Sequence, residues 1–239
     1  MRLAKKAAKV LLFTFLFTFF FGVCFCLYVS EVLVLTKPSC EIEVMGDGEG
    51  YLIRNEWGVW EMYLKGSPYD RGVKYGELAT DLIQKQEEVF VDQINHFVPN
   101  TFFQKFLRIV IGVFNRNIVN HIPTEFLQEI YGVSHAFSPE YNYISSGFMR
   151  ILNYHAAHDL GHALNDYSLV GCTSFGVLDT SHAGGSLLIG RNFDFYVGDE
   201  FSKEKLILFL DPHDGYAFAS YSWAGFMGVA SGMNEKGLS

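Results

Sequence analysis

Cysteine is scarce in this sequence, and its spacing does not fit a metal site. The 239 residues include four cysteines, Cys24, Cys26, Cys40 and Cys172. Cys24 and Cys26 are two residues apart, too close for a usual disulfide, and we interpret them as lipid-facing or core residues. A bridge between Cys40 and Cys172 is conceivable in an oxidising compartment, but it would silence the residue to which the strongest motif points.

Positive charge is also in short supply. There are 18 Lys and Arg against 26 Asp and Glu, a formal net charge of −8. Because Arg2, Lys5, Lys6 and Lys9 all lie at the start, the remainder of the chain is more acidic still. This balance argues against nucleic-acid binding. The sequence also lacks a phosphate-binding glycine loop, internal repeats and low-complexity segments.

Charge is absent altogether from Val10 to Val29, directly after the basic start. That length is sufficient to span a bilayer. No Ala-x-Ala-like cleavage site ends the apolar run, which favours a retained anchor over a cleaved signal, the main alternative. A lipoprotein at Cys24 fits less well. The basic flank predicts a cytoplasmic start, with the rest of the protein periplasmic or extracellular.

The remaining pattern predicts helices first and strands afterwards. A turn-rich cluster opens a short strand or hairpin at residues 46–63, and short apolar runs separated by Gly and Asp turns after Val170 indicate an antiparallel sheet. Helical spacing of apolar residues predicts helices over residues 70–97, 102–119, 124–137 and, less regularly, 145–164. The expected class is therefore α+β.

The most informative stretch surrounds Cys172. The segment Val170-Gly171-Cys172-Thr173-Ser174 is followed across a predicted hairpin by Gly190-Arg191-Asn192-Phe193-Asp194-Phe195. This pair resembles the first two strands of the N-terminal-nucleophile (Ntn) hydrolases, nearest to the penicillin acyltransferase-like branch. Choloylglycine hydrolases and acid ceramidase are more distant relatives in that resemblance.

Two further segments extend the resemblance over residues 60–239. Upstream, Gly66-Ser-Pro68 followed by Gly72 and Gly76 is similar to an early glycine-proline motif of the acyltransferase branch. Downstream, Gly232-Met-Asn234-Glu-Lys-Gly-Leu238 is similar to a strand-turn segment of choloylglycine hydrolases. The Cys and Arg-Asn-x-Asp pair is the specific part.

The resemblance implies self-cleavage between Gly171 and Cys172. A thiol is mostly protonated at neutral pH and needs a base or a positive neighbour. The freed α-amino group of Cys172, which titrates near about pH 8, supplies a base on the same residue. Arg191 would favour the thiolate by its fixed charge, and Asp194 would orient the new amino group. Thr173 and Ser174 are weaker candidate nucleophiles, because they require another cleavage point.

The implied fold is an Ntn-type αββα sandwich of antiparallel sheets. We expect a cytoplasmic flank and transmembrane helix (or signal) at residues 1–36, a mostly helical pro-region at 37–171 and the start of the sheet domain at 172–239. The chain ends inside a strand-turn motif, so we expect a fragment rather than a product that ends early. The oxyanion-binding Asn of the family would then fall beyond Ser239.

Several residues have weaker assignments. His155, His158 and His162, with Asp159, could face one side of a helix and bind a metal, but Gly161 interrupts the helical pattern. We instead expect the histidines to line or support a pocket, with His158 and Asp159 assisting self-cleavage. Possible support also comes from Asn192 and Asn234. An acyl pocket could be walled by Tyr196, Phe201, Tyr221, Trp223 and Phe226.

The predicted function is an autoproteolytically activated cysteine amidase that cleaves linear amide bonds through a thioester on Cys172. Its substrate would be a small N-acyl compound: lipid-like, an acyl amino acid or a bile-acid conjugate. Acyl transfer from a thioester to an amine uses the same cysteine, and a decayed, membrane-anchored binding protein is the alternative from another class. The resemblance implies no cofactor and no metal, and the sequence does not indicate an oligomeric state.

Overall fold

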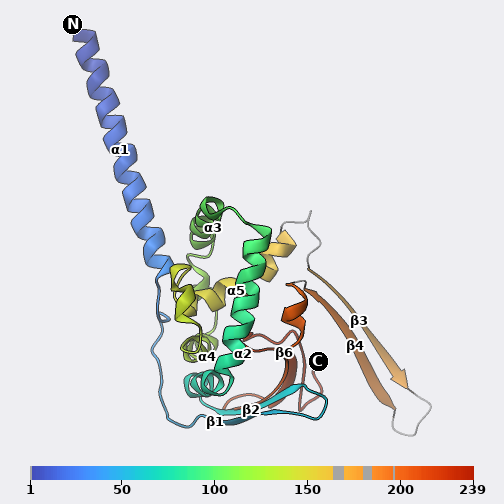
Figure 1. Ribbon diagram of the computed structural model, residues 1–239. Helices are drawn as coiled ribbons and strands as arrows, with labels where there is room; N and C mark the ends of the chain where they lie inside the picture. Colours follow the sequence, from blue (N-terminus) through green and yellow to red (C-terminus); the bar gives the residue numbers. More distant parts are fainter. Residues whose placement is uncertain (1, 164–169, 180–184, 196) are drawn as a thin grey trace.

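The computed structural model describes residues 2–163, 170–179, 185–195 and 197–239, and these residues form an α+β fold. Five α-helices and two β-sheets are present within them. This confirms the predicted class. Figure 1 shows three parts: a long N-terminal helix, a body of helices above a sheet, and a projecting hairpin.

Helix α1 (Arg2–Leu33) projects from the body like a rod (Figure 1). Its residues from 6 to 28 are exposed, whereas Val29 and Leu33 are buried against the body. In the described part of the chain, Lys6–Leu33 is the segment whose length and composition would let it cross a membrane. A signal sequence has the same properties, so α1 is compatible with either reading.

The larger sheet has five strands in the order β1-β2-β5-β6-β7. The predicted hairpin is present as β1 (Glu49–Arg54) and β2 (Trp60–Gly66). The later strands are β5 (Lys205–Pro212), β6 (Phe218–Trp223) and β7 (Ser231–Asn234). Strands β2 and β5 pair in parallel, so the expectation of wholly antiparallel sheets is wrong at this pair. Parallel pairing requires a long crossover, which the intervening helices and hairpin provide.

Helices α2 (Pro68–Phe97), α4 (Thr124–Ser134) and α5 (Gly147–Ala163) form the body above this sheet (Figure 1). The single helix predicted over residues 102–119 is divided in the structure. Helix α3 (Thr101–Phe114) ends at its C-cap Asn115, and the short 3₁₀ helix η1 (Ile118–His121) follows. Two other 3₁₀ turns are η2 (Pro139–Tyr143) and η3 (Asp199–Ser202). The core joins α2, α4 and α5 to buried side chains of the sheet: Met62, Leu64, Leu206, Leu208 and Leu210.

One glycine of the upstream motif and one glycine of α4 allow the two helices to touch. A Cβ at Gly72 would lie 2.2 Å from the carbonyl oxygen of Glu129, and one at Gly132 would lie 2.5 Å from that of Tyr69. Both glycines therefore permit backbone contact between the helices. Beside this contact, Arg71 forms a buried ion pair of 2.5 Å with Glu129 and donates to the carbonyl of Gly66 at 2.9 Å.

The smaller sheet is the antiparallel hairpin of β3 (Val170–Asp179) and β4 (Ser186–Phe195), which projects from the body in Figure 1. Cys172 lies inside β3. The larger sheet and its core combine segments from both sides of that residue. The predicted boundary between 171 and 172 is thus not a boundary of the core, and it stays a prediction about processing.

Candidate thiol site on the hairpin

Strand register brings Cys172 and Arg191 to one face of the β3–β4 hairpin. Cys172 pairs with Phe193, and Ser174 pairs with Arg191. Because directly paired residues point to the same face, all four side chains share it. The guanidinium of Arg191 donates to Cys172 Sγ at 3.5 Å and to Ser231 Oγ on β7 at 3.0 Å. Arg191 also lies over the Phe193 ring, 5.5 Å from its centroid.

Asp194 lies on the opposite face of the hairpin. It pairs with Gly171, and its carboxylate accepts a hydrogen bond of 2.6 Å from the side-chain amide of Asn192. A Cβ on Gly171 would be 3.5 Å from Asp194 Oδ2. The carboxylate is therefore beside the Gly171–Cys172 segment of the backbone rather than beside the thiol. Arg191 thus contacts the sulfur of Cys172, whereas Asp194 lies beside the preceding residue, Gly171.

Cys172 and Arg191 border a cavity of about 370 Å³. Its walls come from α2, α5, the hairpin, η3 and the segment between β6 and β7. Most of the residues that line the cavity are apolar or aromatic. The polar residues among them include Gln86, Glu87 and His155. The lining aromatic residues are Phe90, Phe137, Tyr154, Phe193, Phe195, Phe201, Trp223 and Phe226.

Aromatic rings connect the hairpin to the body at this cavity. Phe195 stacks on Trp223 with ring centroids 6.1 Å apart and an interplanar angle of 10°. Phe193 also contacts Trp223, and Phe201 packs edge-on against both Phe195 and Trp223. Such pairs add about 0.5–1.5 kcal/mol each beyond their burial. The cluster therefore fixes the end of the hairpin that carries Cys172.

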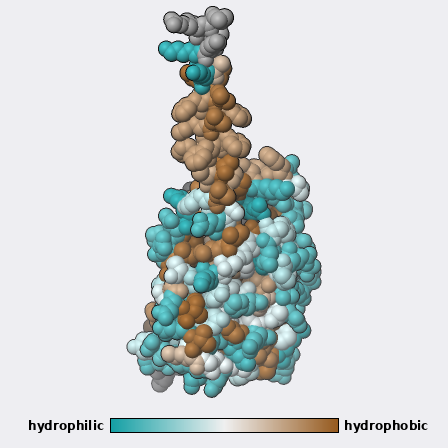
Figure 2. Space-filling view, turned by 90° about the vertical axis from the view of Figure 1, so that its left-hand side faces the viewer, coloured by the Kyte–Doolittle hydropathy of each residue, from teal (hydrophilic) through white to brown (hydrophobic). Residues whose placement is uncertain are grey.

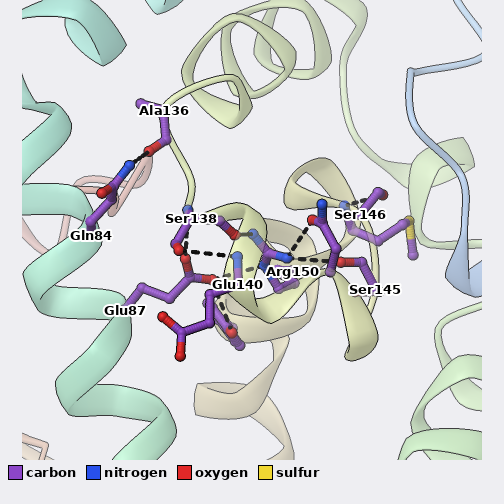
Figure 3. Close-up of polar contacts among 11 residues, drawn as sticks. Gln84, Glu87, Ala136, Ser138, Glu140, Ser145, Ser146 and Arg150 are labelled. Atoms are coloured by element: carbon purple, nitrogen blue, oxygen red, sulfur yellow. Dashed lines mark hydrogen bonds and ion pairs between the residues drawn. The ribbon is translucent and has the colours of Figure 1, made fainter.

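A buried ion pair supports the far wall of the cavity. Glu87 on α2 forms an ion pair with Arg150 on α5, 2.8 Å from Nε, and accepts hydrogen bonds from the Ser138 amide at 3.1 Å and from the Tyr154 hydroxyl at 3.3 Å. Figure 3 shows Arg150 surrounded by such partners, including the carbonyl of Ser145. Burial raises the pKa of Glu87, and Arg150 opposes that rise. Burial and the Glu87 charge raise the pKa of Tyr154, so the phenol stays protonated and donates.

His155 is a neutral, structural member of the wall. Its Nδ1 lies 2.7 Å from the carbonyl of Ile151, and its Nε2 accepts from the Met227 amide at 2.9 Å. These partners assign the proton to Nδ1. The ring stacks on Phe226 at 4.7 Å and 6°, and burial lowers the pKa of His155. Because both nitrogens are engaged, this histidine positions the β6–β7 segment rather than moving a proton at Cys172.

The other predicted residues divide into three groups. Phe201, Trp223 and Phe226 line the cavity, whereas Tyr221 is exposed and absent from the lining. Asn234 accepts from the amides of Lys236 and Leu238 at 3.0 Å each, which makes it a turn residue.

The side chains of His158, Asp159, His162 and Tyr196 lie outside the described residues. Within the residues that are described, no three His, Cys, Asp or Glu side chains are placed as metal ligands.

Sequence reasoning missed Glu87, Arg150 and Ser231. Glu87 and Arg150 each occupy a buried position in a predicted helix, which is an unusual place for a charge. Two charges of opposite sign at such positions could have indicated a buried ion pair. Ser231 gave none, because its contact with Arg191 arises only from the meeting of two sheets.

Comparison with known proteins gives a relative but no family. No family model matches the chain. An uncharacterized protein of Archaeoglobus fulgidus is 28% identical over 204 residues, which cover 80% of this chain and 34% of that protein. The chain thus spans about a third of the length of this relative.

Proposed function

We propose that this chain carries the nucleophile of a cysteine amidase of the Ntn type, which cleaves itself before Cys172 and then hydrolyses N-acyl compounds. The observation that carries the proposal is the guanidinium of Arg191, 3.5 Å from Cys172 Sγ at the border of an apolar cavity. An arginine carries a fixed positive charge and can donate a hydrogen bond to a sulfur that becomes anionic during the reaction. The motif resemblance described above supports the same reading.

Self-cleavage would begin with attack of Cys172 Sγ on the carbonyl carbon of Gly171. The carbon–nitrogen bond of that peptide breaks, the nitrogen takes up a proton, and a thioester forms between Gly171 and the sulfur. Water then hydrolyses the thioester and releases the thiol. The new α-amino group would form at the bond that follows Gly171, and Asp194 lies beside Gly171. An ion pair between them would hold the amine near the sulfur.

Amide hydrolysis would use the same atoms. The α-amine takes the thiol proton, and the thiolate attacks the substrate carbonyl carbon. When the carbon–nitrogen bond breaks, the α-ammonium returns the proton to the leaving amine and an acyl-thioester remains. Water attacks this thioester while the amine accepts a proton, and the products are a carboxylic acid and the free thiol.

The cavity favours an apolar acyl group. Phe193, Phe201 and Trp223 would surround the part of the substrate that stays on the sulfur as the thioester. A volume of about 370 Å³ is at the small end of the range for small-molecule sites. Among the predicted substrates, lipid-like amides and apolar acyl amino acids fit these walls best.

The exposed face of the larger sheet supports the sandwich part of the proposal. Helices cover one face, through buried residues such as Met62 and Leu208. The other face exposes Tyr51, Phe209 and Tyr221 among the described residues. A sheet with apolar side chains on both faces is typical of a layered fold in which both are covered. Membrane anchoring through α1, with the body outside the cytosol, belongs to the same proposal.

Trapping of the acyl-enzyme tests the proposal. Full-length protein would be incubated with a p-nitroanilide of a medium-chain or phenylacyl acid, quenched in acid, digested and analysed by mass spectrometry. We expect the acyl mass on the peptide that begins at Cys172. The matched control is Cys40→Ala, which should trap the same adduct, whereas Cys172→Ala should trap none. An adduct on Cys40 alone, or turnover by Cys172→Ala, would refute the assignment.

A further inference from the structure

Helix α3 exposes an apolar face that the described residues leave uncovered. Phe102 is 80% exposed and Phe114 is 69% exposed, and Phe103, Phe106 and Val110 are also exposed. Positions 103, 106, 110 and 114 recur at helical spacing and form a single stripe. An exposed contiguous stripe of this kind is typical of an interaction site.

The surroundings of this stripe are basic in an acidic protein. Residues 93–124 contain no Asp or Glu, although the whole chain has a net charge of −8. Lys105 on α3 and Arg116 just after its end are exposed, although Arg116 donates to the Val113 carbonyl at 2.8 Å and Arg108 donates to the carbonyl of Tyr143. Helix α3 and the residues after it therefore combine exposed phenylalanines with exposed positive charge, which complements an anionic lipid surface.

The position of α3 points to the same occupant. A Cβ on Gly112 would lie 3.2 Å from Leu33 and 3.3 Å from Val29, so α3 packs closely on the last turns of α1. Val29 lies near the end of the uncharged run that starts at Val10, and Glu31 is the first charged residue after it. In Figure 1 α3 lies at the end of the body from which α1 emerges. Figure 2 shows hydrophobic surface on the rod-like helix and on the adjoining top of the body.

The end of α1 is also held by Ser146, the residue that precedes α5. The Ser146 amide donates to the Leu33 carbonyl at 3.3 Å, and the Ser146 hydroxyl donates to the Leu35 carbonyl. The body is thus attached to α1 by contacts on two sides rather than by an extended linker. A membrane crossed by α1 would meet α3 at the level where the apolar run ends.

We propose that α3 is a second membrane contact, an interfacial helix whose phenylalanine stripe lies in the bilayer that α1 enters. Lys105 and Arg116 lie at its headgroup boundary and favour anionic lipid. This contact holds the body at the membrane surface in one orientation. It does not depend on the chemistry of Cys172.

Nitroxide labels on the full chain test this contact. In a background with all four native cysteines replaced by alanine, single cysteines would be introduced as Phe102→Cys, Phe114→Cys and, as a control, Trp57→Cys. Trp57 is 79% exposed in the β1–β2 turn. Each labelled protein would be reconstituted in phosphatidylcholine vesicles with and without phosphatidylglycerol. Spin relaxation by oxygen would be compared with relaxation by a water-soluble nickel chelate.

We expect labels at 102 and 114 to respond mainly to oxygen, as lipid-immersed groups do, and the label at 57 to respond mainly to nickel. Phosphatidylglycerol should increase the oxygen preference at 102, and Lys105→Gln with Arg116→Gln should remove that increase. Nickel preference at both α3 positions would overturn the proposal. Dipolar coupling between labels at 102 would also overturn it, because the occupant would then be a second copy of the chain.

Discussion

The body and the β3–β4 hairpin differ in how each is stabilised. In the body, α2, α4 and α5 pack around a common core and bury the ion pairs Arg71–Glu129 and Glu87–Arg150. In the hairpin, both faces of the outer half expose apolar side chains, such as Val177, Leu187 and Leu188. A two-stranded hairpin is marginally stable alone. Its inner end is fixed by aromatic contacts with Trp223, and Cys172 lies at that end.

The residues that stabilise the fold are therefore different from the residues proposed to react. The groups that would react lie on an element that contributes little to the core, so they can be changed with little effect on folding. The groups that stabilise the fold lie behind the cavity and do not touch the sulfur. Substitutions in the two regions should therefore produce opposite patterns of stability and reactivity.

The largest effect on stability is expected for Arg150→Met. It removes one partner of a buried pair and leaves Glu87 buried without its counter-ion, which costs about 3–5 kcal/mol. Urea denaturation of the protein in detergent should show this loss of unfolding free energy. The control is Arg54→Met, whose contact with Glu204 is 4.0 Å long and exposed on the Arg54 side, and which should cost less than about 1 kcal/mol. If both variants lose the same unfolding free energy, the buried ion pair does not stabilise the body as described.

Gly72→Ala should have the next largest effect on stability. The added methyl would lie 2.2 Å from the Glu129 carbonyl oxygen, so α2 and α4 must separate. Overpacking of this kind costs about 1–3 kcal/mol. Gly22→Ala on α1 has free space around it and is the matched control for a helical glycine. The midpoint of urea denaturation measures the effect. If the midpoint is the same for Gly72→Ala and the wild type, α2 and α4 do not approach as closely as described.

Arg191→Lys should leave stability within about 0.5 kcal/mol and change reactivity instead. A flexible ammonium cannot hold the sulfur and Ser231 together as the planar guanidinium does. We expect alkylation of Cys172 by iodoacetamide near neutral pH to slow roughly tenfold, as for the loss of one charge-assisted hydrogen bond. The rate at Cys40 in the same sample is the internal reference. If the ratio of the two rates does not change, the guanidinium does not activate the thiol.

The smallest effect concerns pH. Burial lowers the pKa of His155 in the folded protein below the value in the unfolded chain, about 6.5. The unfolded state then binds more protons between these two values, so stability is complete above about pH 6.5 and falls as the pH drops through that window. The slope cannot exceed about 1.4 kcal/mol per pH unit for one proton. His155→Gln should flatten it, and the exposed control His121→Gln should not.

The sequence was informative where the signal is local. Helical spacing predicted α2 and α4, and the turn-rich cluster before β1 predicted the first hairpin. The motif around Cys172 and Arg191 predicted a pair that the strand register brings together. In each case the residues involved lie within one helix or one hairpin. Periodicity and turn chemistry were sufficient for the helices and the first hairpin, whereas the Cys172–Arg191 pair came from the motif resemblance.

Contacts between distant segments could not be predicted in this way. The parallel pairing of β2 with β5 and the ion pair between Glu87 and Arg150 join residues far apart in the chain. Their partners are chosen by packing of whole elements, which a single sequence does not specify. The opposite faces of Cys172 and Asp194 also emerged only from the register, although alternation along β4 contained that information once the hairpin was assumed.

Self-cleavage before Cys172 is the central claim, and the N-terminal sequences of the purified protein test it most directly. Wild-type protein should give two chains by intact mass, and Edman degradation of the second should read Cys-Thr-Ser-Phe. Cys172→Ala should remain one chain, and Cys40→Ala should be cut like wild type. A single uncut chain with full amidase activity, or a new terminus at another residue, would contradict the account.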